Sequence, residues 1–151
     1  MRVAFGSDHA AIIAGTPCVI AKGSRMSLRF LLTISGALEA LVGVLALISP
    51  APVVSLLIKG PTDSLAIVLA RLFGAGVFAL GLACFKTRND VATPAGLAVS
   101  LGITSYNLLA AVVLMWAAAG LSLGGMLLWV AGFGHAILGA LFVAALVGTR
   151  R

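Results

Sequence analysis

Residues 30–49 of the chain read FLLTISGALEALVGVLALIS, and Glu39 is the only charged residue among them. A helix of this length spans about 30 Å, which is the thickness of the hydrocarbon core of a bilayer. Pro50 and Pro52 follow directly and cannot comfortably continue a helix. The stretch therefore predicts a membrane-spanning helix that ends near Ser49.

The same apolar pattern recurs in three further stretches, at about residues 64–85, 95–119 and 122–147. Asp63 or Ser64 can cap the first of these, and Thr93 followed by Pro94 suits the start of the second. With 62% hydrophobic and 9% charged residues, the chain carries more apolar surface than a soluble domain of its size could bury. We predict an all-α integral membrane four-helix bundle with antiparallel, up-down helices, formed by residues 26–151.

Two segments do not fit a membrane span. Residues 1–25 form a mixed, polar leader, which we interpret as a disordered segment or an overextended start ahead of Met26. Residues 52–59 are apolar but too short to cross, so we expect them to lie along the outer interface before the second span.

The basic residues predict the orientation, because short loops rich in Lys and Arg remain cytoplasmic. Lys59 is the only one in the two connections expected on the outer side. The expected inner side holds eight: Arg2, Lys22, Arg25, Arg29, Lys86, Arg88, Arg150 and Arg151. We expect an inner (plasma) membrane protein with both termini in the cytoplasm. The net charge of +6 sits at helix ends, so it does not indicate a nucleic-acid partner.

Each predicted span contributes one strongly polar side chain: Glu39, Arg71, Asn107 and His135. Counting about 1.5 Å per residue from the outer ends places all four in one middle layer of the membrane. Small residues recur at helical spacing around each of them, which favours inward-pointing side chains. We predict an intramembrane cluster of these four residues, with Glu39 paired to Arg71.

Two interpretations of this cluster remain open. It could neutralise its own charges and fix the register of the helices. It could instead form a ligand or catalytic pocket, in which Glu39 and His135 exchange protons while Arg71 holds an anionic or carbonyl oxygen. His135 has no second nitrogen or sulfur ligand nearby, so we expect no metal. Cys18 and Cys84 lack metal-ligand neighbours and a disulfide role, and we regard both as incidental.

Two motifs in the first and second predicted spans carry a family resemblance. Residues 36–43 read GALEALVG, with Pro50 closing the helix, and residues 69–75 read LARLFGA, followed by Gly81 and Leu82. In these motifs the chain resembles the DoxX-like and related uncharacterised small four-helix membrane proteins of bacteria, over about residues 28–147. DoxX itself resembles a membrane subunit of a quinone-linked oxidoreductase. The resemblance therefore implies a redox-associated membrane protein that works with a partner.

Three function classes follow. The first is an accessory or structural subunit of a membrane complex, and this is the reading we favour from the sequence. The second is a membrane-embedded binder or enzyme for a lipophilic ligand. The third is a transporter component, which four helices without an internal repeat support least. The expected partners are the lipid bilayer, a membrane protein or further copies of the chain, and in the second class a lipophilic ligand. The sequence decides neither a catalytic activity nor a cofactor.

Overall fold

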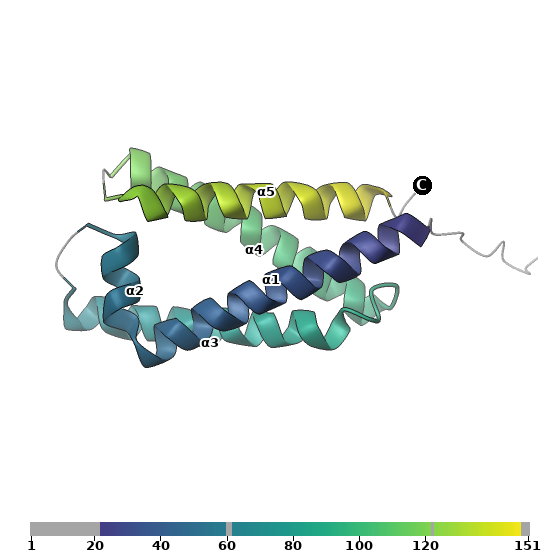
Figure 1. Cartoon of the computed structure of the whole chain (residues 1–151), viewed down its shortest axis with the longest axis horizontal. Helices are drawn as coiled ribbons and strands as arrows, with labels where there is room; N and C mark the ends of the chain where they lie inside the picture. Colours follow the sequence, from purple (N-terminus) through teal and green to yellow (C-terminus); the bar gives the residue numbers. More distant parts are fainter. Residues whose placement is uncertain (1–21, 60–61, 122, 149–151) are drawn as a thin grey trace, which may run out of the picture.

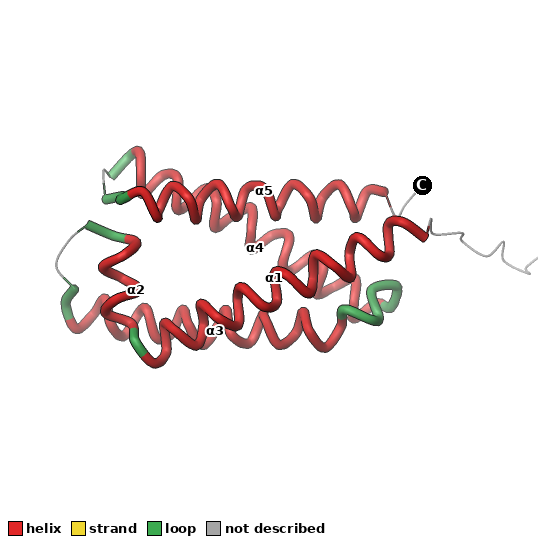
Figure 2. Tube along the Cα trace, in the orientation of Figure 1, coloured by secondary structure: helices red, strands yellow, loops and turns green. Residues whose placement is uncertain are grey.

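The computed structural model describes residues 22–59, 62–121 and 123–148, and in these ranges its regular structure is entirely helical (Figure 2). The helices are α1 (Lys22–Ile48), α2 (Pro50–Leu57), α3 (Ser64–Thr87), α4 (Pro94–Ala119) and α5 (Met126–Gly148). All but α2 are long and apolar enough to cross a membrane. The prediction of an all-α chain with four spans is confirmed, and the four spans indicate a multi-pass membrane protein.

The helix boundaries depart from the predicted ones mainly at two places. α1 begins at Lys22, within the predicted polar leader, although its apolar span begins only at Leu28. The rest of that leader, residues 1–21, lies outside the described residues. α5 begins at Met126 instead of residue 122, because Leu123 and Gly124 pair with the chain that follows α2.

The two predicted helix caps are confirmed. The Asp63 carboxylate accepts a hydrogen bond from the backbone N–H of Ala66 over 2.8 Å at the start of α3. The Thr93 hydroxyl accepts one from the backbone N–H of Gly96 over 3.1 Å at the start of α4. Each bond satisfies a backbone donor that the first turn of a helix leaves unpaired. These caps fix where both spans begin.

The four long helices run alternately up and down (Figure 1). The start of α1, the α3–α4 connection and the end of α5 lie together at one end of the bundle, which we call the basic end because Arg29, Lys86 and Arg88 lie there. The other end, the α2 end, holds α2 across the bundle. There an antiparallel bridge pairs Ile58 with Gly124, and the Lys59 N–H donates to the Leu123 carbonyl over 2.8 Å.

The long helices form two antiparallel pairs, in which α1 packs chiefly against α3, and α4 against α5. Glycines allow the closest approach in the first pair: a Cβ on Gly43 would stand 2.7 Å from the carbonyl oxygen of Gly74, and one on Gly81 would stand 2.8 Å from that of Gly36. Small residues at such positions are the usual means of packing helices in lipid. These contacts also set the register of α1 against α3.

The apolar core that joins the two pairs lies toward the basic end. Its buried members come from all four long helices: Leu28, Leu31, Leu32, Cys84, Ile103, Phe142, Ala145 and Leu146. Because these residues lie near the start of α1 and the end of α5, the pairs are most tightly joined there. Glu39, Asn107 and His135 lie on the α2 side of this core.

Candidate functional site

Glu39 lies in the middle of α1 and is buried, with 4% of its surface exposed. It is the only glutamate in the chain, and the other described acidic residues, Asp63 and Asp90, lie outside the spans. Burial of a carboxyl group in an apolar layer is costly unless the group is hydrogen-bonded or paired with a cation. The partners of Glu39 therefore decide how the site is interpreted.

Tyr106 of α4 is the side chain that meets Glu39. Its hydroxyl lies close enough to the Glu39 carboxylate for the two groups to interact. Its ring stands edge-on to the ring of His135 on α5, with the ring centroids 5.5 Å apart and the planes at 88°. Tyr106 thus connects α1 to α5 through one side chain, although the prediction from sequence did not include it.

The signal for Tyr106 was present in the sequence but ambiguous. It is the only tyrosine of the chain and adjoins Asn107, from which it points about 100° away around the helix. α4 packs mainly on α5 and also touches α1, so neighbouring faces of α4 can both reach polar partners. The sequence alone does not show how the helices are arranged, so it does not predict the contacts of Tyr106.

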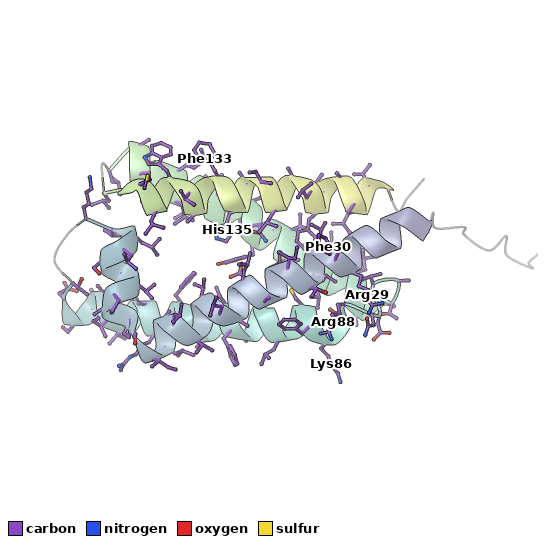
Figure 3. All side chains as sticks on the ribbon, in the orientation of Figure 1. Arg29, Phe30, Lys86, Arg88, Phe133 and His135 are labelled. Atoms are coloured by element: carbon purple, nitrogen blue, oxygen red, sulfur yellow. The ribbon has the colours of Figure 1, made fainter. Side chains whose placement is uncertain are left out.

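Asn107 and His135 meet as predicted. The Asn107 side chain is fully buried, and its Oδ1 lies 2.9 Å from Nδ1 of His135. Its Nδ2 donates to the backbone carbonyl of Ile103 over 2.8 Å, so Oδ1 is the group left to accept. Nδ1 of His135 is therefore the protonated nitrogen, and in the neutral ring Nε2 is an acceptor. The half-buried His135 points from α5 toward the middle of the bundle (Figure 3).

Arg71 does not join this cluster. The structure does not contain the predicted ion pair between Arg71 and Glu39. The glycine contacts of α1 and α3 place Arg71 about two turns, roughly 11 Å, from the level of Glu39 toward the α2 end. Its side chain is exposed, and among the described residues Glu39 has no salt bridge. The distance between Arg71 and Glu39 along the bundle is caused by α2. Because this short helix lies between α1 and α3 in the chain, α3 begins beyond the level at which α1 ends.

The helical face of Arg71 also differs from the predicted one. The buried face of α3 is formed by Gly74, Val77, Gly81 and Cys84. The centre of that face lies roughly 100° around the helix from Arg71. An arginine near the end of a span and on an exposed face can extend its guanidinium to the membrane surface, which lowers the cost of its charge.

Two further groups lie beside Glu39. Cys84 of α3 is buried and close enough for the charge of Glu39 to act on it. Ser35, one turn before Glu39 on α1, is fully buried, and its hydroxyl has no hydrogen-bond partner in the structure. By contrast, the buried hydroxyls of Ser100 and Thr104 donate to carbonyls of their own helix.

Beyond the level of this site toward the α2 end, some apolar side chains of the spans are exposed. On α1, Val42 is 37% exposed, although Ala46 stays buried against Gly74 of α3. On α3 and α4 the residues two turns beyond Leu80 and Tyr106 are exposed, Phe73 by 48% and Val113 by 58%, whereas Leu128, two turns from His135 on α5, is 2% exposed. The polar cluster, which we define as Glu39, Tyr106, Asn107 and His135, lies on the α2 side of the apolar core that joins the two pairs.

Within the described ranges, no three His, Cys, Asp or Glu side chains gather as a metal site would require. Comparison with family models, curated proteins and solved structures gives no match. The resemblance to DoxX-like proteins stays a prediction from the two motifs of α1 and α3. The proposed chemistry of the site therefore rests on the side chains that form it.

Proposed function

We propose that this protein binds a lipophilic molecule inside the membrane and holds its polar group with Glu39, Tyr106 and His135. The observation that carries the proposal is the buried Glu39 carboxyl without a cationic partner. A purely structural role required Arg71 to neutralise that charge, and Arg71 lies elsewhere. An ionisable group kept in a span at such cost is by default part of a functional site.

The arrangement of the helices supports access from the hydrocarbon layer. Tyr106 and His135 are half-buried, so both retain surface that another molecule can contact. Beyond them toward the α2 end, each helix pair has exposed apolar side chains, such as Phe73 of α3 and Val113 of α4. A few convergent polar groups beside apolar walls are typical of small-molecule sites.

We also propose the plasma membrane as the location, with the basic end facing the cytoplasm. Arg29, Lys86 and Arg88 lie at that end (Figure 3), and the α2 end has Lys59 together with the acidic Asp63. This charge distribution supports the orientation by the positive-inside rule. It places the ligand site at mid-depth, with the apolar core between it and the cytoplasm.

Native mass spectrometry of the protein purified from its own membrane tests the binding function. We expect an added mass of a lipophilic molecule on the wild type and its loss from Glu39→Gln, which keeps the side-chain size. Arg71→Gln is the matched control, because it removes a polar group of a span away from the site. Retention of the same mass by Glu39→Gln, or its absence from all three proteins, would contradict the proposal.

A second candidate is the accessory-subunit role, and the exposed Arg71 is the observation that favours it. A guanidinium on a span can pair with a carboxylate on a partner helix, and such pairs orient membrane subunits. In native membranes, Arg71→Gln should then release the chain from a larger complex in blue-native gels. An unchanged size for the variant would reject this role for Arg71.

A further inference from the structure

The surroundings of Glu39 lack positive charge. Arg71 is about two turns away toward the α2 end, and Arg29 lies ten residues before Glu39 on the same helix. Among the described residues, the Glu39 carboxylate has no salt bridge. An ionised carboxylate without a counter-charge in an apolar layer is unfavourable, so the site gains most from a ligand that brings positive charge.

Most hydrogen-bond donors of the cluster are already used. Nδ2 of Asn107 donates to the Ile103 carbonyl, and Nδ1 of His135 donates to Oδ1 of Asn107. The Tyr106 hydroxyl lies close enough to the Glu39 carboxylate to interact with it. A ligand that needs to receive hydrogen bonds, such as a carboxylate or a phosphate, therefore finds only the Ser35 hydroxyl and the second N–H of Asn107 as donors, and no neighbouring cation to pair with its charge.

The acceptors, in contrast, remain available. A carboxylate accepts several hydrogen bonds, and the single Tyr106 hydroxyl can satisfy only one of the Glu39 positions. Nε2 of His135 is an acceptor in the tautomer that Asn107 fixes. The Ser35 hydroxyl, with 0% exposure and no partner, adds a third acceptor one turn from Glu39 on the same side of α1.

The aromatic rings add to the preference for a cation. Tyr106 and His135 stand edge-on, so the two planes are nearly perpendicular at 88°. The face of a tyrosine ring attracts a cation within about 6 Å of its centroid, and more strongly when water is excluded. A positively charged head group beside Glu39 could use this face as well as the acceptors.

Building on the proposed binding function, we infer that the ligand is a lipophilic amine. Its protonated head group donates hydrogen bonds to the acceptors of Glu39, His135 and Ser35, and its positive charge pairs with the Glu39 carboxylate. Its hydrocarbon part lies toward the α2 end, along the exposed Val42, Phe73 and Val113. Three N–H donors of a primary ammonium match three acceptors, whereas an alcohol brings one donor and a carboxylate brings none.

Four amphiphiles that share a dodecyl tail test the class of head group: dodecylamine, dodecyltrimethylammonium, dodecanol and dodecanoate. The full chain in nanodiscs of phosphatidylcholine is titrated with each, and the shift of the thermal unfolding midpoint gives the affinity. We expect dodecylamine to bind tighter than dodecanol by about tenfold or more, the factor of one charge-assisted hydrogen bond. Dodecyltrimethylammonium should bind between the two, because it has the charge but no N–H donor.

Labelling by a lipophilic carbodiimide provides a second readout on the same samples. The reagent adds to a carboxyl group in an apolar environment, and mass spectrometry of the peptide identifies Glu39 as the modified residue. Dodecyltrimethylammonium, which has no N–H that the activated carboxyl could acylate, should protect Glu39 in the wild type. Glu39→Gln should remove both the label and the preference for dodecylamine.

Two serines offer a matched pair of variants. Ser35→Ala removes the unpartnered hydroxyl and should weaken the binding of dodecylamine severalfold. Ser100→Ala removes an equally buried hydroxyl that bonds to its own helix over 2.8 Å and should leave the affinity unchanged. If Glu39→Gln fails to fold, this pair decides the question, because neither alanine introduces a charge or a larger side chain.

The outcomes separate the ligand class from the binding function. Equal or tighter Glu39-dependent binding of dodecanol or dodecanoate would overturn the amine and leave an intramembrane binding site. Shifts that are the same in wild type and Glu39→Gln would also overturn it, since they would reflect partition into lipid. The proposed binding function itself would be contradicted only if native mass spectrometry found no bound molecule that depends on Glu39.

Discussion

Nδ1 of His135 lies 2.9 Å from Oδ1 of Asn107, across the interface of α4 and α5. The Asn107 amide is held by its own helix through Ile103, so its oxygen is presented to α5 in a fixed orientation. The bond therefore has two consequences. It links two spans, and it leaves Nε2 of His135 as an acceptor.

A double-mutant cycle measures the first consequence. Asn107→Ala and His135→Ala should each destabilise the bundle, and together by less than their sum. The coupling should be about 0.6 kcal/mol and at most about 1.7 kcal/mol, the range of interhelical hydrogen bonds in membrane proteins. Unfolding in mixed micelles with increasing dodecyl sulfate gives the four free energies. Simple additivity would show that this hydrogen bond does not join the helices.

The same experiment on Glu39→Gln and Arg71→Met distinguishes the structure from the expectation based on sequence. A direct ion pair would make the double variant recover much of the loss in either single variant. Because the two residues are about two turns apart and Arg71 is exposed, we expect additivity within about 0.5 kcal/mol. Recovery of stability in the double variant would support the pair and contradict the register described above.

The parts that the sequence predicted well depend on local properties. An apolar run long enough for a bilayer, followed by Pro50, predicts a helix and its end without reference to any other segment. The caps by Asp63 and Thr93 are equally local, because each contacts a backbone N–H three residues ahead. Asn107 and His135 were also predicted to lie in one cluster, and the structure places them in contact across α4 and α5.

The failures concern register and rotation, which depend on how the helices pack. Arg71 and Glu39 have similar distances from the ends of their spans, but α2 displaces α3 relative to α1. The close contacts of Gly43 with Gly74 then fix the rotation of α3, and Arg71 falls outside the buried face. Tyr106 was missed for the same reason. Its contact with Glu39 depends on α4 reaching α1, and no local pattern in the sequence encodes that.

Glycine substitutions test the close approach of α1 and α3. Gly43→Ala places a methyl group 2.7 Å from the Gly74 carbonyl oxygen and the Phe78 backbone, so the helices must separate. We expect a loss of about 1–3 kcal/mol, as for other overpacked sites. Gly76→Ala is the control on α3, because its Cβ would have no neighbour within 4 Å and should be neutral. Equal effects of both substitutions in dodecyl sulfate titrations would mean that helix propensity, not packing, determines the result.

Cysteine accessibility decides the orientation of the bundle. In a chain with Cys18 and Cys84 replaced by alanine, Asn89→Cys reports the basic end and Leu121→Cys reports the α2 end; both positions are exposed. If the basic end faces the cytoplasm, a membrane-impermeant maleimide added to intact spheroplasts should label only Leu121→Cys. After permeabilisation it should label both, which shows that Asn89→Cys is reactive. Labelling of Asn89→Cys in intact spheroplasts would reverse the topology, and the site would then be closed by its apolar core toward the outside instead of the cytoplasm.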